Sequence, residues 1–402
     1  MLINDPVHGL VQLDSLQKDL LGLPELARLA WIKQLGLAFL SFPGATHTRL
    51  GHVIGASTVA AMMARALDVS PGERLLLEAA GLLHDVGHTP FSHALESLLQ
   101  GDHMACTRDL IVGTARLPLP GTGRIPEVLA SHGVDPAEVG ALVSGRHPDP
   151  LLQGLIFGNV DSDQLDYLLR DSYFCGVSHG QIDLYRILYT LKADLGDREV
   201  LVEEKGVDAV EEMLVARDHM YSAVYGHKTT RIAEMMLLRA MQLAEPPIVD
   251  FATMRDHDLT ARLARAGATT ERMIERVLCR RLYKTAYRVE SRGRDERAAR
   301  VAELMDRVTA RQLEAELAAE TGLSPGDVIV DLPVSVFELS EPRLKQFKLK
   351  VLRRSGERVP LLELSTLAQA LTRKESAQTV FATYCDISHR DAVAAACRAR
   401  LE

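Results

Sequence analysis

The sequence predicts a mainly α-helical fold, in which a helical core is followed by a smaller α+β lobe at the C-terminal end. Three observations lead to this fold class. Apolar residues recur at helical spacing through most of residues 1–245, residues that start and end helices flank these stretches, and most runs typical of strands lie after residue 326. We therefore expect two domains, residues 1–245 and residues 246–402.

The first helices of the core are predicted from their apolar spacing and from the residues at their ends. Thr48 is placed to cap one helix, Pro71 suits the first position of the next, and Gly87 is a natural stop. Thr89 and Pro90 are typical of the first turn of a further helix. The expected helices span residues 25–36, 49–67, 73–84 and 89–99.

The later elements follow from composition and pattern. A Gly- and Pro-rich stretch, 113–126, is expected to be a loop, and helices resume after it to about Lys192. Residues 195–205 indicate a short hairpin, and 207–244 indicate one long helix. The C-terminal lobe is expected to hold a charged helical stretch and three strands, at 293–321, 327–333, 347–354 and 379–386.

The composition is that of a soluble globular protein. The chain has 402 residues, 47% of them hydrophobic, and no apolar stretch reaches the roughly 18 residues that a membrane span needs. Its first residues lack the basic and apolar regions of a signal peptide. Five scattered cysteines without a Cys-x-x-Cys pair indicate reduced thiols and a cytoplasmic location. The net charge of −8 disfavours indiscriminate nucleic-acid binding but leaves room for a local basic pocket that holds phosphates.

The stretch GLLHDVGHTPFSHALE, residues 81–96, gathers three histidines and an aspartate after an apolar helical stretch. His84 and Asp85 fall at the predicted C-terminal end of a helix, where unpaired carbonyls favour a cation. Neutral imidazoles and ionised carboxylates are good ligands for borderline divalent metals. On this stretch alone, core packing explains the histidines equally well.

Two further stretches favour a metal site. THTRLGH, residues 46–52, places Arg49 and His52 three apart on one helix face. NVDSDQLDYLLRDSYFCGV, residues 159–177, carries several aspartates inside an amphipathic helix, and capping explains only those at its start. The resulting candidate ligands are His52, His84, Asp85 and Asp163.

The order and spacing of this set resemble the HD-domain phosphohydrolases, and further motifs resemble their dNTP triphosphohydrolase branch. The matching motifs are NDPVHG (4–9), IKQLG (32–36), FPGATHTRLGH (42–52), LLHDVGHTPFSH (82–93), DSDQLDYLLRD (161–171) and YGHK (225–228). They cover residues 1–235 densely. The resemblance implies an HD-domain helical core that hydrolyses dNTPs to deoxynucleoside and triphosphate by attack at the α-phosphorus.

The resemblance also implies roles for the clustered histidines and aspartates. His52, His84, Asp85 and Asp163 correspond to the ligands of one divalent metal, which is Fe, Mn, Zn, Ni or Co, while Mg or Mn accompanies the phosphates. Asp163 is thereby also a catalytic residue. His93 matches the general acid for the 5′ leaving oxygen, and His88 matches a phosphate contact. The alternative for both is that they only orient the ligands.

A nucleotide-binding surface is implied in the same way. Arg49 matches a phosphate contact, for which a surface ion pair is the alternative. Leu35 and Tyr225 match groups beside the sugar that leave no partner for a ribose 2′-hydroxyl, which favours deoxynucleotides. Arg217, Tyr221, Tyr225 and Lys228 share a stripe of the predicted long helix, unless that face is merely solvated. The other implied contacts are Gln34, His103, Gln164, Tyr167 and Asp171.

Some positions depart from the animal enzyme of this branch. Gln164 stands where that enzyme has a phosphate-binding lysine, and Met104 stands where it has a glutamate after the histidine. Gly22, Ala27 and Ala30 occupy the positions of its guanine-reading residues, so activation by GTP is not expected. The match starts at the first residues, so a preceding sterile-alpha-motif domain is not expected.

The implied partners are a nucleotide and further copies of the chain, as a dimer or tetramer under allosteric control, with no membrane partner. Both nucleotide-pool balance and antiviral defence suit such an enzyme. Two alternatives stay open at this point. One is an HD phosphohydrolase that acts on nucleoside monophosphates, cyclic dinucleotides or nucleic-acid ends, and the other is a nucleotide-sensing scaffold with weak turnover.

Overall fold

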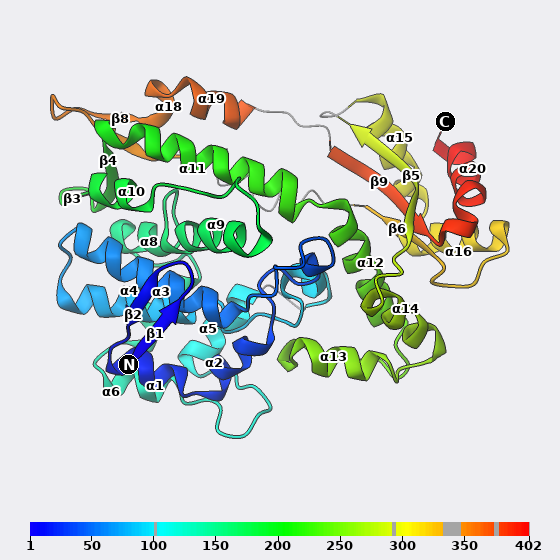
Figure 1. Cartoon of the computed structure of the whole chain (residues 1–402), viewed down its shortest axis with the longest axis horizontal. Coiled ribbons are helices and arrows are strands. Elements are labelled where there is room, and N and C mark those ends of the chain that lie inside the picture. Colours follow the sequence, from blue (N-terminus) through cyan, green and yellow to red (C-terminus); the bar gives the residue numbers. More distant parts are fainter. Residues whose placement is uncertain (100–102, 292–294, 333–346, 374–377, 402) are drawn as a thin grey trace. The chain divides into compact units, whose positions relative to one another are not determined.

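A computed structural model describes residues 1–99, 103–291, 295–332, 347–373 and 378–401 (Figure 1). Helices dominate and the sheets are small, which confirms the predicted fold class. By its contacts the chain forms two compact units, residues 1–224 with 250–257 and 343–372, and residues 225–249 with 258–342 and 373–402. The expected domains 1–245 and 246–402 stay a prediction. Within the described residues, no helix combines the length and apolar character needed to cross a membrane.

The first unit contains most of the helices. Its helices are α1 (Ser15–Leu21), α2 (Pro24–Arg28), α3 (Arg49–Ala66), α4 (Pro71–Leu83), α5 (His103–Val112), α6 (Ile125–Ser131), α7 (Pro136–Val143), α8 (Pro150–Ile156), α9 (Ser162–Cys175), α10 (Leu184–Thr190), α11 (Val207–Met220), α18 (Leu361–Leu364) and α19 (Thr366–Arg373). Shorter helical turns are η1 (Leu29–Trp31), η2 (Ala38–Leu40), η3 (Ser92–Leu98), η4 (Glu204–Gly206), η5 (Tyr221–Tyr225) and η6 (Phe251–Thr253).

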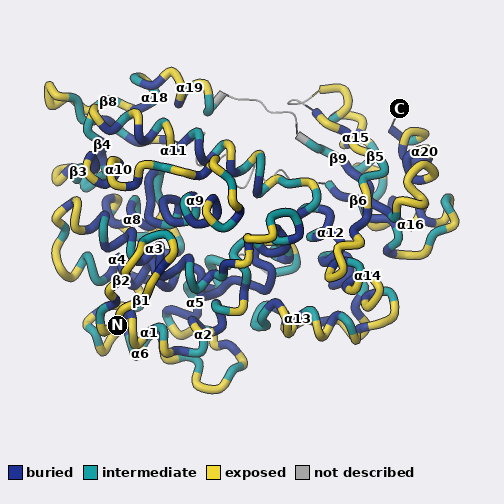
Figure 2. Tube along the Cα trace, viewed as in Figure 1, coloured by how far each residue is buried: buried dark blue, intermediate teal, exposed yellow. Residues whose placement is uncertain are grey.

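Small residues bring the central helices α3, α4 and α9 close together. Most of α3 is buried, as Figure 2 shows. A Cβ atom at Gly81 of α4 would lie 2.9 Å from the Cα atom of Ser57 in α3, and one at Gly55 would lie 1.9 Å from the Asp166 carboxylate in α9. Glycine at both positions therefore permits the close approach that lets polar groups of three helices meet inside the first unit.

The strands of the first unit form two small sheets. Strands β1 (Leu2–Asp5) and β2 (Gly9–Gln12) make an antiparallel hairpin, which the sequence pattern did not reveal. The other sheet has the order β3-β4-β7-β8, from β3 (Leu191–Asp194), β4 (Glu199–Glu203), β7 (Lys350–Leu352) and β8 (Arg358–Pro360). Strand β7 pairs in parallel with β4. The predicted strand at 347–354 is thus confirmed, but it joins the predicted hairpin rather than the other C-terminal strands.

The second unit holds the α+β part of the fold. Its sheet has the order β5-β9-β6, and helices pack over a core that includes Leu317, Val330 and Phe381. Its elements are α12 (Lys228–Gln242), most of α13 (Asp256–Leu263), α14 (Ala268–Leu278), β5 (Lys284–Ser291), α15 (Glu296–Arg307), α16 (Ala310–Thr321), β6 (Val328–Asp331), β9 (Gln378–Cys385), η7 (Ile387–His389) and α20 (Arg390–Leu401). The predicted strands at 327–333 and 379–386 are present, except that residue 333 lies outside the described residues, as do 293 and 294 of the charged stretch.

Three predicted helices differ from the structure. The range 25–36 holds only α2 and η1, after which Lys33 bridges to Thr48. The predicted α-helix 89–99 does not form, because Phe91 and Ser92 have left-handed backbone angles. A 3₁₀ helix begins there instead, at Ser92. The long helix 207–244 is interrupted after Tyr225, and the His227 side chain, accepting from the Thr229 amide at 3.3 Å, caps a new helix.

Candidate metal centre

The four predicted metal ligands come from three helices of the first unit and converge. The His52 Nε2 atom in α3 lies 3.2 Å from His84 Nε2 and 3.1 Å from Asp163 Oδ1 in α9. His84 is the residue that ends α4, and its Nε2 atom lies 3.5 Å from Asp85 Oδ1 and 3.8 Å from Asp163 Oδ1. Two imidazoles and two carboxylates therefore face one small volume.

The chemistry of this donor set fits a divalent metal. Imidazole nitrogen with carboxylate oxygen suits Mn, Fe, Co, Ni and Zn. His52 and Asp85 are buried, while Asp163 keeps a quarter of its side chain exposed, so the cluster has a solvent-facing side. Burial opposes protonation of His52, but hydrogen bonds to Asp163 and Asp166 outweigh it and raise its pKa to about 10. The carboxylates thus create a potential that attracts positive charge.

Hydrogen bonds fix which nitrogen of each histidine faces the cluster. The His84 Nδ1 atom lies 2.9 Å from the Gly81 carbonyl oxygen of its own helix. The His52 Nδ1 atom lies 2.8 Å from Asp166 Oδ2. Both Nδ1 atoms have acceptors, so both Nε2 atoms face the centre, an arrangement typical of metal-ligating histidines.

Arg49 is buried beside the cluster instead of lying on the surface. Its guanidinium is paired with Asp85 and donates from Nε to Ser92 Oγ at 2.9 Å. Although burial of Asp85 acts in the opposite direction, the charges of Arg49 and His84 hold the pKa of that carboxyl well below its usual range. The ion pair expected as the alternative for Arg49 exists, but inside the protein and with a candidate metal ligand.

A second group of histidines adjoins the first. His88 Nε2 lies 3.3 Å from Asp85 Oδ1, and its ring stacks on His103 at 4.0 Å between centroids. The His93 ring meets the His88 ring edge-on at 4.9 Å. Burial, aided by the nearby Arg49 charge, holds the pKa of His88 well below its usual range, so this imidazole is neutral at pH 7.

Glu96 is a residue of this group that the sequence reasoning missed. Its Oε2 atom lies 2.7 Å from His93 Nδ1, and its other oxygen is bonded to His103 Nδ1. Burial opposes ionisation of Glu96, yet its bonds to the two imidazoles hold its pKa far below the usual range. Its position three residues after His93 was the available signal, since residues so spaced on a helical turn are neighbours.

A hydrogen bond connects two of the phosphate-side candidates, Gln164 and Arg217. Gln164 is buried, donates to Asp161 Oδ2 at 2.9 Å, and accepts from Arg217 Nη1 at 3.2 Å. The Arg217 guanidinium lies 5.6 Å from the centre of the Tyr221 ring. Asp161 caps α9 by accepting from the Gln164 amide, so the capping alternative holds for Asp161.

The sugar- and base-side candidates fall into two places. Asp171 Oδ1 lies 2.8 Å from His47 Nε2, and the His47 carbonyl accepts from the Gln34 amide at 3.0 Å, which links α9 to the loop that carries Leu35. Tyr167 is half-buried on α9. Tyr221 and Tyr225 both lie in η5, after the end of α11, whereas Lys228 begins α12 after the interruption, so the predicted continuous stripe does not reach Lys228. Tyr225 and Lys228 belong to the second unit.

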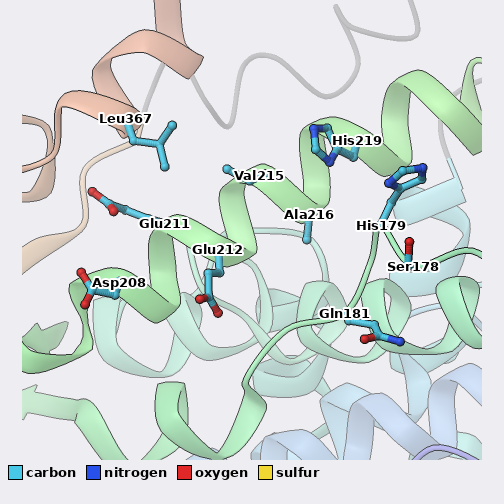
Figure 3. A pocket seen from close by; sticks show the side chains of 10 residues that line it. All are labelled: Ser178, His179, Gln181, Asp208, Glu211, Glu212, Val215, Ala216, His219 and Leu367. Atoms are coloured by element: carbon cyan, nitrogen blue, oxygen red, sulfur yellow. The ribbon is translucent and has the colours of Figure 1, made fainter.

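A separate pocket of about 420 Å³ lies along α11 (Figure 3). His179 and His219 face each other there with ring centroids 5.4 Å apart, and Asp208, Glu211 and Glu212 are the acidic residues of the lining. Among the described residues this pair belongs to no group of three metal-ligating side chains. Its carboxylates would repel a triphosphate, so the pocket suits neither part of the predicted chemistry.

The sequence matches the HD domain family over residues 49–116 and the family called HD associated region over residues 182–402. The chain therefore belongs to the HD-domain proteins that carry this associated region, which confirms the predicted family. HD domains bind divalent metals, and the histidine and aspartate groups described above are able to hold one.

Three similar proteins illustrate the family. An uncharacterized protein of Bacillus subtilis is 37% identical over 61% of this chain and 56% of its own length. The deoxynucleoside triphosphate triphosphohydrolase SAMHD1 of Danio rerio is 26% identical over 70% of this chain and 55% of its own. A crystal structure of a hypothetical Aquifex aeolicus protein superposes with a TM-score of 0.75 at 27% identity, covering 98% and 99% of the two chains. The chain thus spans a little over half the length of these curated relatives.

Proposed function

We propose that this chain hydrolyses deoxynucleoside triphosphates to a deoxynucleoside and triphosphate, with a divalent metal held by His52, His84, Asp85 and Asp163. The observation that carries the proposal is that the His52 and His84 Nε2 atoms lie 3.1–3.8 Å from each other and from carboxylate oxygens of Asp85 and Asp163. His93, which is hydrogen-bonded to Glu96, belongs to the adjoining group of histidines. The activity in the name of the Danio rerio relative supports the same substrate class.

The metal is Fe, Mn, Zn, Ni or Co, with Mg or Mn accompanying the phosphates. When bound, it lowers the pKa of water and offsets charge on the phosphoryl oxygens. The chain's part is to hold the ligands: Asp166 and the Gly81 carbonyl orient the two imidazoles, and Arg49 keeps Asp85 ionised. Water attacks the α-phosphorus and its oxygen stays with the triphosphate, while the bond from that phosphorus to the 5′ oxygen breaks and the 5′ oxygen is protonated.

His93 is the general acid of the proposed reaction. Its side chain is 62% exposed, so it can reach a bound nucleotide, while Glu96 accepts a hydrogen bond from Nδ1. The Glu96 carboxylate holds Nδ1 and so orients the ring with Nε2 toward the 5′ oxygen, which takes the proton as it leaves. Glu96 acts here as a positioning residue, and its other carboxylate oxygen is bonded to His103.

Positive and neutral donors line the proposed phosphate path. Arg49 lies against the metal ligands and contributes charge there. His88 is neutral, so its ring has one N–H group. That group can donate a hydrogen bond to a phosphate oxygen, while His93 supplies the proton of the reaction. Arg217 contributes a guanidinium that Gln164 and Tyr221 hold in place. The remaining proposed contacts are His103, Gln164, Tyr167 and Lys228.

The sugar and base are proposed to contact Gln34, Leu35, Asp171 and Tyr225. The Gln34 Oε1 atom is buried and has no hydrogen-bond partner among the described residues, so it is available to a hydroxyl or amino group of the nucleotide. Leu35 and Tyr225 offer no partner to a ribose 2′-hydroxyl. Burying that hydroxyl unpaired costs about 1–3 kcal/mol, which selects deoxynucleotides.

The functional form is proposed to be a homo-oligomer. Exposed apolar side chains of the first unit include Leu2, Leu10 and Tyr173, each more than 60% accessible. Such residues are often covered when chains associate. The assembly is also proposed to be insensitive to GTP, because Gly22, Ala27 and Ala30 have no side chain that can bond a guanine edge.

The deciding experiment is chromatography of products after incubation with each dNTP and NTP in Mn²⁺ or Mg²⁺. We expect equimolar deoxynucleoside and triphosphate, abolished in His84→Ala and retained in His132→Ala, which removes a histidine whose surface partner is Asp19. Orthophosphate or a monophosphate as the product, or no turnover with any metal, would overturn the proposal.

A further inference from the structure

The strongest unassigned feature is a buried polar network around Asp166 of α9. Asp166 has no exposed surface, yet both of its carboxylate oxygens are engaged. Its Oδ2 atom accepts from His52 Nδ1 at 2.8 Å and from Arg170 Nε at 2.8 Å. Its Oδ1 atom accepts from Arg170 Nη2 at 2.9 Å and lies 2.6 Å from His8 Nε2.

The network reaches the N-terminal hairpin, more than 150 residues away in sequence. Arg170 Nη1 donates to Asp5 Oδ2 at 2.9 Å. Asp5 Oδ1 in turn accepts from the amides of Val7 and His8 at 2.9 Å, which fixes the turn between β1 and β2. The hairpin turn that carries His8 is therefore held in place by the same arginine that holds Asp166.

The network has no spare room. A Cβ atom at Gly55 would lie 1.9 Å from Asp166 Oδ1 and 2.3 Å from Arg170 Nη2. Glycine at this position of α3 thus lets the carboxylate sit directly behind His52, only three residues along the same helix. The side chain of His8 is 5% exposed, so it too is inside the protein.

We propose that Asp166 is a positioning residue for the metal ligand His52, and that His8 of the N-terminal hairpin completes the metal centre by holding Asp166. Asp166 keeps the proton of His52 on Nδ1 and leaves the Nε2 lone pair directed at the ion. The proposal rests on the proposed metal site. Partners of this kind commonly contribute 10- to 100-fold to metal affinity.

The reason why Asp166 has two partners besides His52 is electrostatic balance. Arg170 neutralises the buried carboxylate. His8 bonds to the Oδ1 atom of Asp166, to which Arg170 also donates. Without His8, Asp166 is free to rotate toward Arg170 and to weaken its bond to His52. Glutamine at position 8 retains an N–H donor, whereas alanine does not.

The test measures Mn²⁺ and Co²⁺ affinity of the full chain by competition with a chelator, together with the visible spectrum of bound Co²⁺. We expect Asp166→Asn to weaken affinity by about 10- to 100-fold and His8→Ala by about tenfold, with His8→Gln restoring most of the loss. The control His132→Ala removes the histidine of a surface His–Asp pair and should bind as wild type. Circular dichroism and thermal midpoints establish that each variant is folded.

The outcomes separate this inference from the proposed site. If the wild type binds no metal, or if His84→Ala binds as the wild type does, the metal centre itself is wrong. If the wild type binds, His84→Ala does not, and folded His8→Ala keeps wild-type affinity and Co²⁺ spectrum, only the inference fails. Should Asp166→Asn not fold, the comparison of His8→Ala with His8→Gln still decides.

Discussion

The Nε2 atoms of His52 and His84 lie 3.2 Å apart, although their Nδ1 atoms already have acceptors in Asp166 and the Gly81 carbonyl. Two lone pairs so close repel each other unless a proton or a cation lies between them. In the metal-free protein the high pKa of His52 places a proton there. Metal binding should accordingly release a proton near neutral pH.

The first prediction concerns metal content. His84→Ala and Asp163→Ala each remove one ligand from the centre without touching the apolar core, so both should lose the metal and keep the fold. Elemental analysis after dialysis measures the loss, and His132→Ala serves as the matched control. Full metal content in either variant would contradict the ligand assignment.

The second prediction concerns proton transfer. His93→Ala should slow turnover by about 10²–10⁴-fold, the usual contribution of a general acid. Glu96→Gln keeps the shape of the side chain but removes the carboxylate that holds His93 Nδ1, so it should lower kcat less than His93→Ala does. With isotopically labelled water, the label should enter triphosphate. Label in the nucleoside hydroxyl excludes attack at the α-phosphorus.

The third prediction concerns the sugar. Tyr225→Ala should slow dNTP turnover. It should also reduce the ratio of dNTP turnover to NTP turnover, because water can then hydrogen-bond to the 2′-hydroxyl of a ribonucleotide. Tyr221→Ala, which removes the ring beside Arg217, should slow turnover without reducing that ratio. Competition between dATP and ATP measures both. Equal cleavage of the two by the wild type would show that the sugar contacts are misassigned.

The fourth prediction concerns regulation. Gly22 and Ala27 are exposed, Ala30 is half-buried, and none of them has a side chain that can bond a guanine edge. Each guanine group left without a partner would lose about 1–3 kcal/mol. GTP should therefore neither stimulate turnover nor change the oligomer size seen by light scattering. Strong stimulation by GTP would show that these positions do not correspond to a guanine site. The many arginines and lysines of residues 293–354 predict that a dNTP activator, if one acts, binds there instead, although part of that range lies outside the described residues.

The fifth prediction concerns stability and pH. Burial of Glu78 in α4, reinforced by a hydrogen bond with Asp14, raises its pKa from 4.5 to about 7. The folded state therefore binds more protons than the unfolded state between these values, and Glu78 costs stability as pH rises through that window. A shift of this size corresponds to about 3 kcal/mol. Glu78→Gln should be more stable than the wild type at pH 8 in urea unfolding.

The comparison at low pH supplies the control for Glu78. Below pH 4.5 the carboxyl is protonated in both states, so the advantage of Glu78→Gln should disappear there. An equal difference at pH 4 and pH 8 would show that packing, rather than ionisation, separates the two proteins.

Local signals were enough to predict the elements that frame the site. Thr48 and Ser70 stand at the starts of α3 and α4, where such residues are typical, although only Ser70 makes the capping hydrogen bond with its side chain. His52, His84, Asp85 and Asp163 could be grouped because the family motifs fix their order. Their convergence depends on the close approach of three helices, which no local pattern specifies.

The features that escaped prediction depend on distant contacts. The left-handed turn at Phe91 is held by a hydrogen bond from its amide to Asp256, 165 residues away. His8 and Asp166 meet across 158 residues. The interruption after Tyr225 follows from Gly226 and from the capping side chain of His227. The spacing of apolar residues, from which the long helix was predicted, does not reveal either feature.

The parallel pairing of β7 with β4 has a consequence for how the chain is made. Leu201–Glu203 meets Lys350–Leu352, so a ribosome must synthesise about 150 further residues before β4 acquires its second neighbour. Until then β4 is an open edge strand, with unpaired amides and carbonyls that can pair with another nascent chain. Truncation between the two strands would make that state permanent. Fragments that end near residue 245 should therefore aggregate even though they contain every proposed metal ligand.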